Sequence, residues 1–481
     1  MKTMRTMKKR LMIVMLVASL LTVSLLTGCM VGPKYNRPAV KPPQVFRGTA
    51  DPTPPADSAS LADLKWFEVF KDDQLQELIR TALVQNYDLR DAVARVDAAR
   101  ANLGITRSNQ YPGLVAGANV TTQRNSSNGG VALPAGASQE RNFGSFALSL
   151  LSFELDIWGR LRRATEAARA DLLATEENRK AVITTLVGDV STSYFTLLEL
   201  DTELEIAKRT LDSRRDSLRL INVREQGGVA TMLDVRQAEQ LVYTATQTIA
   251  DTERRMEQTE NLISLLLGKN PAEVARGRRL TEQEQPPAVP PGLPSALLER
   301  RPDIRAAEQN LIAANALIGV AKASYFPQIS LTGSLGGQSN QLTNLFSGAS
   351  RTWSFVPQIT QPLFIAGRLK STVRLAEAQQ QIALVQYERA IQNSFREVSD
   401  ALVQYRKVAE IQTQRELLVT TLRDRSRLAY LRYRGGVDTL LNALDADRDL
   451  FNAELSLAQS RRDELLALVQ LYKALGGGWQ Q

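Results

Sequence analysis

From Lys370 to Tyr433 the chain reads KSTVRLAEAQQQIALVQYERAIQNSFREVSDALVQYRKVAEIQTQRELLVTTLRDRSRLAYLRY, a run of 64 residues without glycine or proline. At 1.5 Å per residue a helix of this length spans about 95 Å, more than a compact domain needs. Apolar residues in the run recur at alternating spacings of four and three, which is typical of a coiled-coil seam. The members of this seam are Ile391, Phe395, Val398, Leu402 and Tyr405. We therefore predict a very long helix that packs along one stripe and leaves its other faces to water.

The chain uses this unit twice. Three motifs frame the run and recur 208 residues earlier: Gly367-Arg368-Leu369, Gly435-Gly436-Val437 and Leu475-Gly476 match Gly159-Arg160-Leu161, Gly227-Gly228-Val229 and Leu267-Gly268. Further upstream, an offset of 215 superposes Asp88, Arg90, Gly104 and Pro112 on Asp303, Arg305, Gly319 and Pro327. Helical composition alone does not preserve such spacings, so we predict one structural unit present in two copies.

Within each unit we expect a helix, two strands, a very long helix and a further helix. Repeat 1 is expected over residues 61–270, with a β-hairpin at about 113–155, a long helix at 162–225 and a helix at 229–267. Repeat 2 is expected over residues 295–476, with the corresponding elements at about 328–364, 370–433 and 437–475. A Pro-rich linker (271–294) and a tail (477–481) complete the assignment.

The two shorter helices of a unit together match the long one in length. In repeat 1, Leu89–Gln110 and Val229–Leu267 are 22 and 39 residues long, 61 in all, so we expect them to stack end to end beside the long helix. The tight turns that join the helices fall at the glycine pairs Gly227-Gly228 and Gly435-Gly436. Glycine supplies the backbone freedom that such a turn requires.

The strands alternate apolar with smaller or polar residues over about ten positions. Aromatic residues flank them, namely Tyr111, Phe143, Trp158, Tyr325, Phe326 and Trp353. This pattern suits a lipid-spanning β-barrel with aromatic girdles, although a soluble hairpin with core aromatics fits the strands alone equally well. The fourth strand, Trp353–Phe364, contains Pro357 and Pro362, so its pairing is the least secure.

Four strands cannot close a barrel, and an open sheet edge is not tolerated in lipid. Closure therefore requires several copies of the chain. Two, three or four copies would give eight, twelve or sixteen strands, and the strand count alone does not choose among them.

The N-terminal segment has the layout of an export signal. Residues 1–28 have a basic start and an apolar run from Leu11 to Leu26, which is too short for a comfortable membrane span. The ending Leu26-Thr27-Gly28-Cys29 resembles the lipobox of bacterial lipoproteins, which implies an acylated Cys29 at the mature N-terminus. An ordinary export signal followed by a small buried cysteine is the alternative. Met30 in place of aspartate implies, by resemblance to the lipoprotein sorting rule, transfer to the outer membrane. Pro-rich residues 29–60 are then expected to form an acylated, extended tether.

The composition excludes most familiar catalytic chemistry. The 481 residues include no histidine and one cysteine, so a Cys/His zinc site, a Ser-His-Asp triad and a Cys-His pair cannot form. We expect no enzyme activity and no cofactor beyond the covalent lipid on Cys29. The net charge of +8 includes five basic residues in the first 28; removing these from the 59 basic residues leaves an excess of three over 51 acidic ones. The remaining charge does not indicate a nucleic-acid partner.

Three motifs together resemble one family. They are Met30-Val31-Gly32-Pro33-Lys34-Tyr35, Asp156-Ile157-Trp158-Gly159-Arg160 and Leu471-Tyr472-Lys473-Ala474-Leu475-Gly476-Gly477-Gly478-Trp479. The mature chain resembles the outer membrane factors, the outer-membrane channels of tripartite RND-type efflux pumps, with a TolC-like fold and more closely their OprM/NodT-like lipoprotein branch. The resemblance implies a mainly α fold with a β-barrel portion: a homotrimer with a twelve-stranded transmembrane barrel and a twelve-helix periplasmic tube.

The resemblance also implies a function. The chain would be a lipid-anchored outer-membrane duct extending into the periplasm, which passively conducts drugs or other toxic small molecules. A periplasmic adaptor and an inner-membrane RND transporter would be its partners. Two alternatives stay open: a TolC-like channel for protein secretion, and a soluble periplasmic coiled-coil scaffold, which would leave the hairpins unused.

The same resemblance points to a gate at the periplasmic end. The segment Gly436-Val437-Asp438 through Leu441 to Asp445-Ala446-Asp447-Arg448 matches the gate-bearing motif of the family. This match implies that Leu441 forms an apolar constriction, that Asp445 forms an acidic ring and that Arg448 bonds to close the mouth. Repeat 1 carries Leu233, Gln237 and Gln240 at these positions, so the ring would be threefold. Alternatively, Asp445 and Arg448 are an ordinary i,i+3 surface pair worth about 0.2–0.5 kcal/mol.

Overall fold

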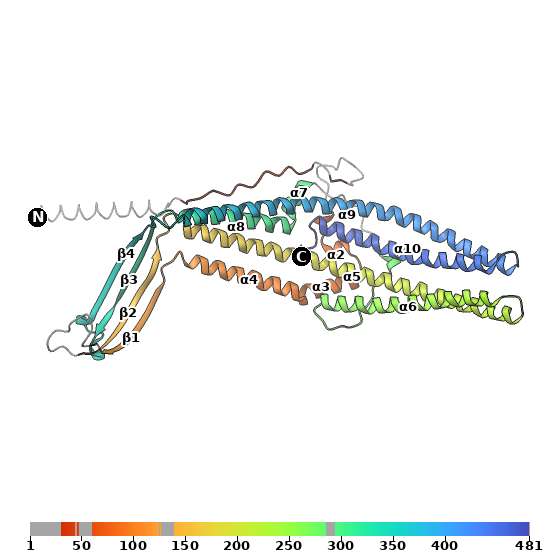
Figure 1. Ribbon diagram of the computed structural model, residues 1–481, viewed down its shortest axis with the longest axis horizontal. Coiled ribbons are helices and arrows are strands. Elements are labelled where there is room, and N and C mark those ends of the chain that lie inside the picture. The colour runs from red at the N-terminus through yellow and green to blue at the C-terminus, as the bar shows by residue number, and fades with distance from the viewer. Residues whose placement is uncertain are drawn as a thin grey trace. The chain divides into compact units, whose positions relative to one another are not determined.

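The computed structural model describes residues 30–43, 46–47, 60–124, 126, 139–284 and 294–480. The expected signal segment and Cys29 lie outside the described residues, as do residues 285–293 of the expected linker. The elements labelled in Figure 1 and the short 3₁₀ helices follow in chain order: η1 (Leu61–Asp63), α2 (Trp66–Val69), α3 (Asp73–Gln85), α4 (Tyr87–Ser108), β1 (Leu114–Arg124), β2 (Glu140–Glu154), α5 (Arg160–Gln226), α6 (Met232–Leu266), η2 (Leu280–Glu282), α7 (Pro294–Arg300), α8 (Pro302–Ala323), β3 (Gln328–Ser339), η3 (Leu342–Asn344), η4 (Gly348–Ser350), β4 (Arg351–Thr360), α9 (Arg368–Arg434) and α10 (Leu440–Ala474).

The duplication is visible in the helix lengths. Helices α4 and α8 have 22 residues each, α5 and α9 have 67 each, and α6 and α10 have 35 each. Both long helices begin two residues before, and end one residue after, the spans expected from the sequence. The two-repeat fold is therefore confirmed.

The chain divides into two compact units that cut across the repeats. The strand unit holds the residues up to Pro38, Asp97–Ala174 and Ala307–Gln386. The helix unit holds Ala39–Val96, Thr175–Ala306 and Tyr387–Gln481. Each unit takes equivalent pieces from both repeats, so each contains the same local architecture twice.

The strand unit is built on one antiparallel sheet in the order β1-β2-β3-β4 (Figure 1). Leu148 pairs with Leu335 across β2 and β3, and the register shifts between Leu150 and Phe153. Every residue of β4 and all but one of β1 are exposed, and among the described residues no apolar side chain of the four strands is buried. In the part of the chain that the structure describes, β1 and β4 each have a strand partner on one side only.

The fourth strand is shorter than expected. It ends at Thr360, whereas the sequence analysis extended the strand to Phe364. Pro357 lies inside the strand opposite Leu331, and Pro362 lies beyond its end. Proline has no N–H to give to a strand ladder and is tolerated mainly at sheet edges, which is where β4 lies.

The N-terminal segment is docked against the helices of the strand unit. Val31 N donates to Trp158 O at 3.1 Å, and Arg163 Nε donates to Val31 O at 3.2 Å. Gly32 has φ +102° and crosses Gly319 of α8 so closely that a Cβ on Gly32 would lie 2.5 Å from the Gly319 Cα. Only glycine fits both demands. Within the expected tether, the described residues 30–43 form no helix or strand, in keeping with an extended chain, and Val31 and Gly32 are held by these contacts.

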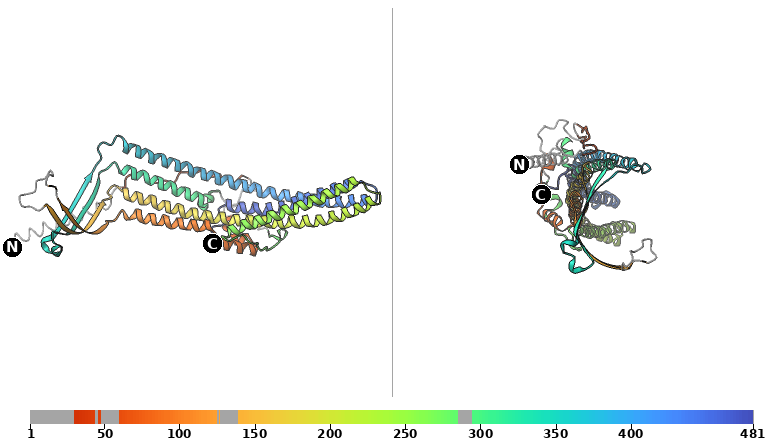
Figure 2. Two further views of the ribbon diagram at one scale, coloured as in Figure 1. Left: turned by 60° about the horizontal axis from the view of Figure 1, so that its bottom comes forward. Right: turned by 90° about the vertical axis from the view of Figure 1, so that its left-hand side faces the viewer.

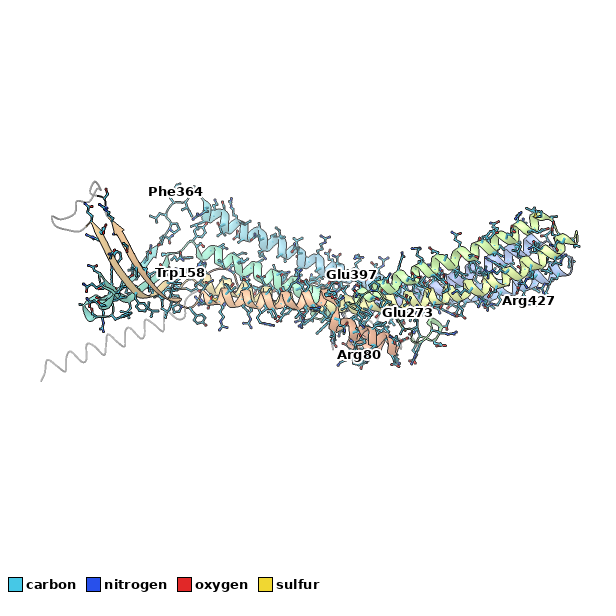
Figure 3. The ribbon with its side chains drawn as sticks, turned by 90° about the horizontal axis from the view of Figure 1, so that it is seen from below. Arg80, Trp158, Glu273, Phe364, Glu397 and Arg427 are labelled. Atoms are coloured by element: carbon cyan, nitrogen blue, oxygen red, sulfur yellow. The ribbon has the colours of Figure 1, made fainter. Side chains whose placement is uncertain are left out.

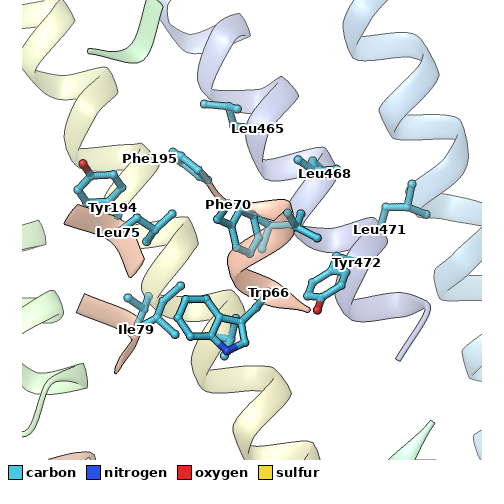
Figure 4. Packing of buried hydrophobic residues seen from close by; sticks show 14 of the residues in the cluster. Trp66, Phe70, Leu75, Ile79, Tyr194, Phe195, Leu465, Leu468, Leu471 and Tyr472 are labelled. Carbon is cyan, nitrogen blue, oxygen red and sulfur yellow. The ribbon is translucent and has the colours of Figure 1, made fainter. Parts of the chain in front are cut away.

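The core of the helix unit lies where α2 and α3 pack on α5 and α10 (Figure 4). Its members include Trp66, Phe70, Leu75, Ile79, Tyr194, Phe195, Leu468, Leu471 and Tyr472. Phe70 and Tyr472 meet edge to face, with ring centroids 6.1 Å apart. Helices α2 and α3 are short and were not predicted. The coiled-coil seam of α9 is confirmed, because Ile391, Val398 and Leu402 are buried while Phe395 and Tyr405 pack against the core.

One buried aspartate fastens the segment after α6 to this core. Asp72 caps α3 by accepting from Gln74 N and Leu75 N at 2.9 and 3.1 Å. It also accepts from Arg278 N at 3.0 Å and from the Tyr194 hydroxyl at 3.1 Å. Burial raises the pKa of Tyr194, so the hydroxyl stays protonated and donates.

The shorter helices meet end to end, as the length argument predicts. In repeat 1, Asn86 Nδ2 donates to Leu266 O at the end of α6, while its Oδ1 accepts from Leu89 N in the first turn of α4. In repeat 2 the equivalent residue is Arg301, which donates to Ala474 O at the end of α10 at 2.9 Å. The same backbone junction is therefore made by two different side chains.

Helical tips and the candidate gate

The glycine pairs end both long helices in the same way. Gly228 and Gly436 have φ +71°. Val229 N donates to Arg224 O at 2.8 Å, and Val437 N donates to Arg432 O at 3.0 Å. This hydrogen-bond pattern is the Schellman motif. We expected permissive φ values at both glycines of each pair, but only the second adopts a positive φ, because one left-handed residue is enough to end the helix. Both tips lie at the same end of the helix unit (Figure 2).

The two tips expose equivalent apolar side chains. Val229 and Leu233 lie at the tip of repeat 1, and Val437 and Leu441 lie at the corresponding positions of repeat 2; all four are exposed. Beneath them the tips pack on each other through a buried cluster formed by Ile221, Val235, Ala238, Leu241, Tyr433, Leu440, Ala443 and Leu444. The helix ends are therefore joined, while Val229, Leu233, Val437 and Leu441 stay outside this cluster and exposed.

The two turns are held by different polar contacts. At the tip of repeat 1, Thr231 and Asp234 form a reciprocal capping box at the start of α6. At the tip of repeat 2, Asp438 accepts from Asn442 and, at 3.0 Å, from Arg432 Nε. These bonds, that from Asn442 first, lower the pKa of Asp438 and keep it ionised. The turn of repeat 2 thus depends on an exposed ion pair.

The structure brings the predicted gate residues onto one stretch of α10. Asp445 Oδ1 lies 3.0 Å from Arg448 Nη1, and Arg448 Nη2 lies 3.5 Å from Asp449 Oδ1. Asp445 is half-buried, whereas Arg448 is exposed. Leu441, also exposed, lies one turn before Asp445. In repeat 1, Gln237 is half-buried and Gln240 is exposed, so neither can make the equivalent ion pair.

Asp447, two residues after Asp445, has a different role that the sequence analysis missed. Its Oδ2 lies 2.8 Å from Nε of Arg214 on α5, whose side chain is 3% exposed. Arg214 also donates to Leu241 O at 2.9 Å and stacks over Phe451 at 4.7 Å. Arg214 thereby ties α5, α6 and α10 together. Repeat 2 carries Leu422 at the position of Arg214, so no duplicated motif could have signalled the contact.

Comparisons with known proteins agree with this architecture. The family described as "Outer membrane efflux protein" matches residues 78–269 and 293–477. The "Probable efflux pump outer membrane protein TtgC" of Pseudomonas putida is 40% identical over 469 residues, covering 96% of this chain and 95% of that protein. "Outer membrane protein OprJ" of Pseudomonas aeruginosa is 38% identical, covering 97% and 96%. Among solved structures, the Neisseria gonorrhoeae MtrE outer membrane channel matches with a TM-score of 0.84 and 33% identity, covering 94% of this chain and 99% of that one.

Proposed function

This chain belongs to the outer membrane efflux protein family, and we propose that three copies of it form the exit duct of an efflux pump, through which small molecules pass passively. The chain is an outer-membrane protein of an efflux system. The observation that carries the proposal is the sheet, which among the described residues has two open edges and no buried apolar side chain. Such a sheet is stable in a membrane only when closed by further strands. Three copies supply the twelve strands that the resemblance implies.

The internal repeat indicates how the copies pair. Within one chain β2 pairs with β3, and Leu148 lies opposite Leu335. The offsets of 208 and 215 carry these two positions to Val356 on β4 and Val120 on β1. If β4 meets β1 of a second copy as β2 meets β3, Val356 lies opposite Val120 of that copy.

The junctions between strands and helices support the same pairing. In repeat 1, Leu155 N donates to Ile329 O at 2.9 Å, and Trp158 stacks on Phe326 with ring centroids 4.6 Å apart. In repeat 2 the residue equivalent to Leu155 is Leu363, which is 93% exposed, and the adjacent Phe364, labelled in Figure 3, is 87% exposed. The groups equivalent to Ile329 and Phe326 are Leu114 and Tyr111, which are also exposed. These surfaces complement each other between copies.

Cross-linking tests this assembly. We expect the double variant Val120→Cys/Val356→Cys, purified in detergent and treated with a short thiol cross-linker, to give a covalent ladder that ends at three chains. Each single variant should give no ladder, which also controls for Cys29. A same-strand control, Val120→Cys/Val115→Cys, places both thiols on β1 and should stay monomeric on the gel. A monomeric protein in detergent, or a double variant without a ladder, would contradict the closure.

Passive conduction is tested on the same material. Wild-type protein in planar bilayers should pass ions without any energy source, because a water-filled duct needs neither a reaction nor a cofactor. We further propose that an acylated Cys29 anchors the duct in the outer membrane and that a periplasmic adaptor and an RND transporter deliver its cargo. Relatives named as toluene and antibiotic efflux pump proteins favour small organic compounds as that cargo. Susceptibility of a deletion strain to a compound panel identifies which ones.

A further inference from the structure

Helix α5 buries two glutamates one turn apart, at the place where it packs on α6 and α10. Glu199 is 0% exposed and Glu203 is 3% exposed. Leu197, Leu198 and Leu200, all buried, surround them on the same helix. Burying a carboxylate in such surroundings is costly unless each of its oxygens finds a partner.

The two carboxyl groups are not equally satisfied. Both oxygens of Glu203 accept hydrogen bonds, one from Arg255 Nη1 of α6 at 3.1 Å and one from Gln459 Nε2 of α10 at 2.9 Å. Glu199 Oε2 accepts from Arg462 Nη1 of α10 at 3.3 Å, whereas Glu199 Oε1 has no partner. Protonation of this oxygen would turn it into a hydrogen-bond donor and so allow it to find a partner.

The electrostatics favour a proton at the same atom. Burial, and then the neighbouring Glu203 carboxyl, raise the pKa of Glu199 to about 8. Arg462 and Arg255 oppose this shift without cancelling it. Arg276, in the segment after α6, is engaged by Asp201 and Glu260 instead.

The long helix does not need these glutamates in order to form. In repeat 2 the positions equivalent to Glu199 and Glu203 carry Lys407 and Ile411, both exposed, and Lys407 pairs with Glu410 at 2.6 Å. The site is therefore a property of repeat 1 alone, added to a helix that the fold builds without it.

We propose that Glu199 and Glu203 form a proton-binding site that couples the packing of α5, α6 and α10 to the pH of the surrounding compartment. One proton is bound to Glu199 Oε1. The resulting hydroxyl donates a hydrogen bond to a Glu203 oxygen, which accepts it with its second lone pair. With the proton bound, both carboxyl groups are fully hydrogen-bonded. When the proton leaves for solvent, two adjacent buried carboxylates remain, and the three-helix contact loosens.

The direction of the pH effect follows from linkage. The folded chain holds this proton up to about pH 8, whereas an unfolded glutamate loses it near pH 4.5. The folded state therefore binds more protons than the unfolded state between these values, and the contribution of Glu199 to stability falls as pH rises through that window. This contribution to stability is fully present below about pH 4.5 and is lost above about pH 8.

Thermal unfolding of the full-length protein in detergent tests the site. Glu199→Gln keeps a donor and removes the titration, so we expect its Tm to exceed that of wild type at about pH 8 and to vary less between about pH 5 and pH 8. The control Glu205→Gln alters an exposed glutamate on the same helix and should keep the wild-type pH dependence.

Infrared spectroscopy gives a readout that does not depend on a variant's stability. The wild-type protein should show the C=O band of a buried protonated carboxyl group at about pH 6, and this band should disappear above about pH 9 and be absent from Glu199→Gln. No such band in wild type, or a Glu199→Gln variant whose Tm follows the wild-type pH profile, would overturn the proposal. Loss of ion conduction or of oligomerisation would instead count against the proposed function and leave this inference standing.

Discussion

Two aspartates two residues apart on α10 perform different tasks. Asp447 is held by the buried Arg214 and belongs to the packing of three helices. Asp445 pairs with the exposed Arg448 on the same helix. Removing the charge of Asp445 should therefore leave the fold intact and change only what happens at the mouth. The gate-bearing motif identifies Asp445 and Arg448 from the sequence. It does not reveal the role of Asp447, because its partner Arg214 lies more than two hundred residues away and has no counterpart in repeat 2.

Neutralising Asp445 should make the closed mouth less stable. As a member of an acidic ring, each Asp445 would hold an exposed charge-assisted bond that exists only in the closed mouth. Such a bond is worth about 0.2–1 kcal/mol, so a threefold assembly loses about 0.6–3 kcal/mol, roughly a three- to hundredfold gain in the opening equilibrium. Single-channel recording of Asp445→Asn in planar bilayers measures this. The matched control is Asp424→Asn, which breaks the exposed Asp424–Arg427 pair on α9. If Asp445→Asn opens no more often than this control, Asp445 is an ordinary surface residue.

Among the helices and strands, the sequence predicts the elements that a local pattern determines. It does not predict the bounds that depend on tertiary contacts. The long helices are predictable because an uninterrupted run and a narrow apolar seam need no partner to be recognised. Helix α2, with four residues, is too short for a periodic signal. Helix α3 does carry one, because its buried residues Leu75, Leu78, Ile79 and Ala82 have helical spacing, and this signal was overlooked. The sequence places the end of β4 at Phe364, because apolar and polar residues alternate up to that point. The strand instead ends at Thr360, and Pro362 beyond it has no N–H for a strand ladder.

The helix ends permit a test within one turn. Gly436→Ala places a Cβ on a residue with φ +71° and should cost about 1–2 kcal/mol, loosening the last turn of α9. Gly435→Ala is the matched control, because its backbone is not left-handed and an added Cβ would meet its nearest neighbours at about 3.4 Å, an ordinary contact distance. Amide hydrogen exchange at the tip should accelerate in Gly436→Ala only. Equal exchange in both variants would mean that the left-handed residue does not control the turn.

For the molecule as a whole, the repeat explains why one chain is incomplete. Leu155 N of repeat 1 donates to Ile329 O of β3, whereas the equivalent Leu363 makes no such backbone bond among the described residues. Leu155 is half-buried beside β3, whereas its equivalent Leu363 and the adjacent Phe364 are exposed. If the copies pair as proposed, this exposed apolar surface is where the next copy would begin.

Replacing these two side chains should separate assembly from folding. The double variant Leu363→Ser/Phe364→Ser removes apolar surface that a single chain does not bury, so helix content by circular dichroism should match wild type. Burial of such a pair between copies contributes about 3–6 kcal/mol per interface, so the variant should sediment mainly as a monomer in detergent. The control Phe346→Ser alters a side chain 77% exposed in the β3–β4 loop and should remain oligomeric. If the variant keeps the wild-type oligomeric state, the contact between copies does not depend on Leu363 and Phe364. The copies must then pair through another surface, not through this junction.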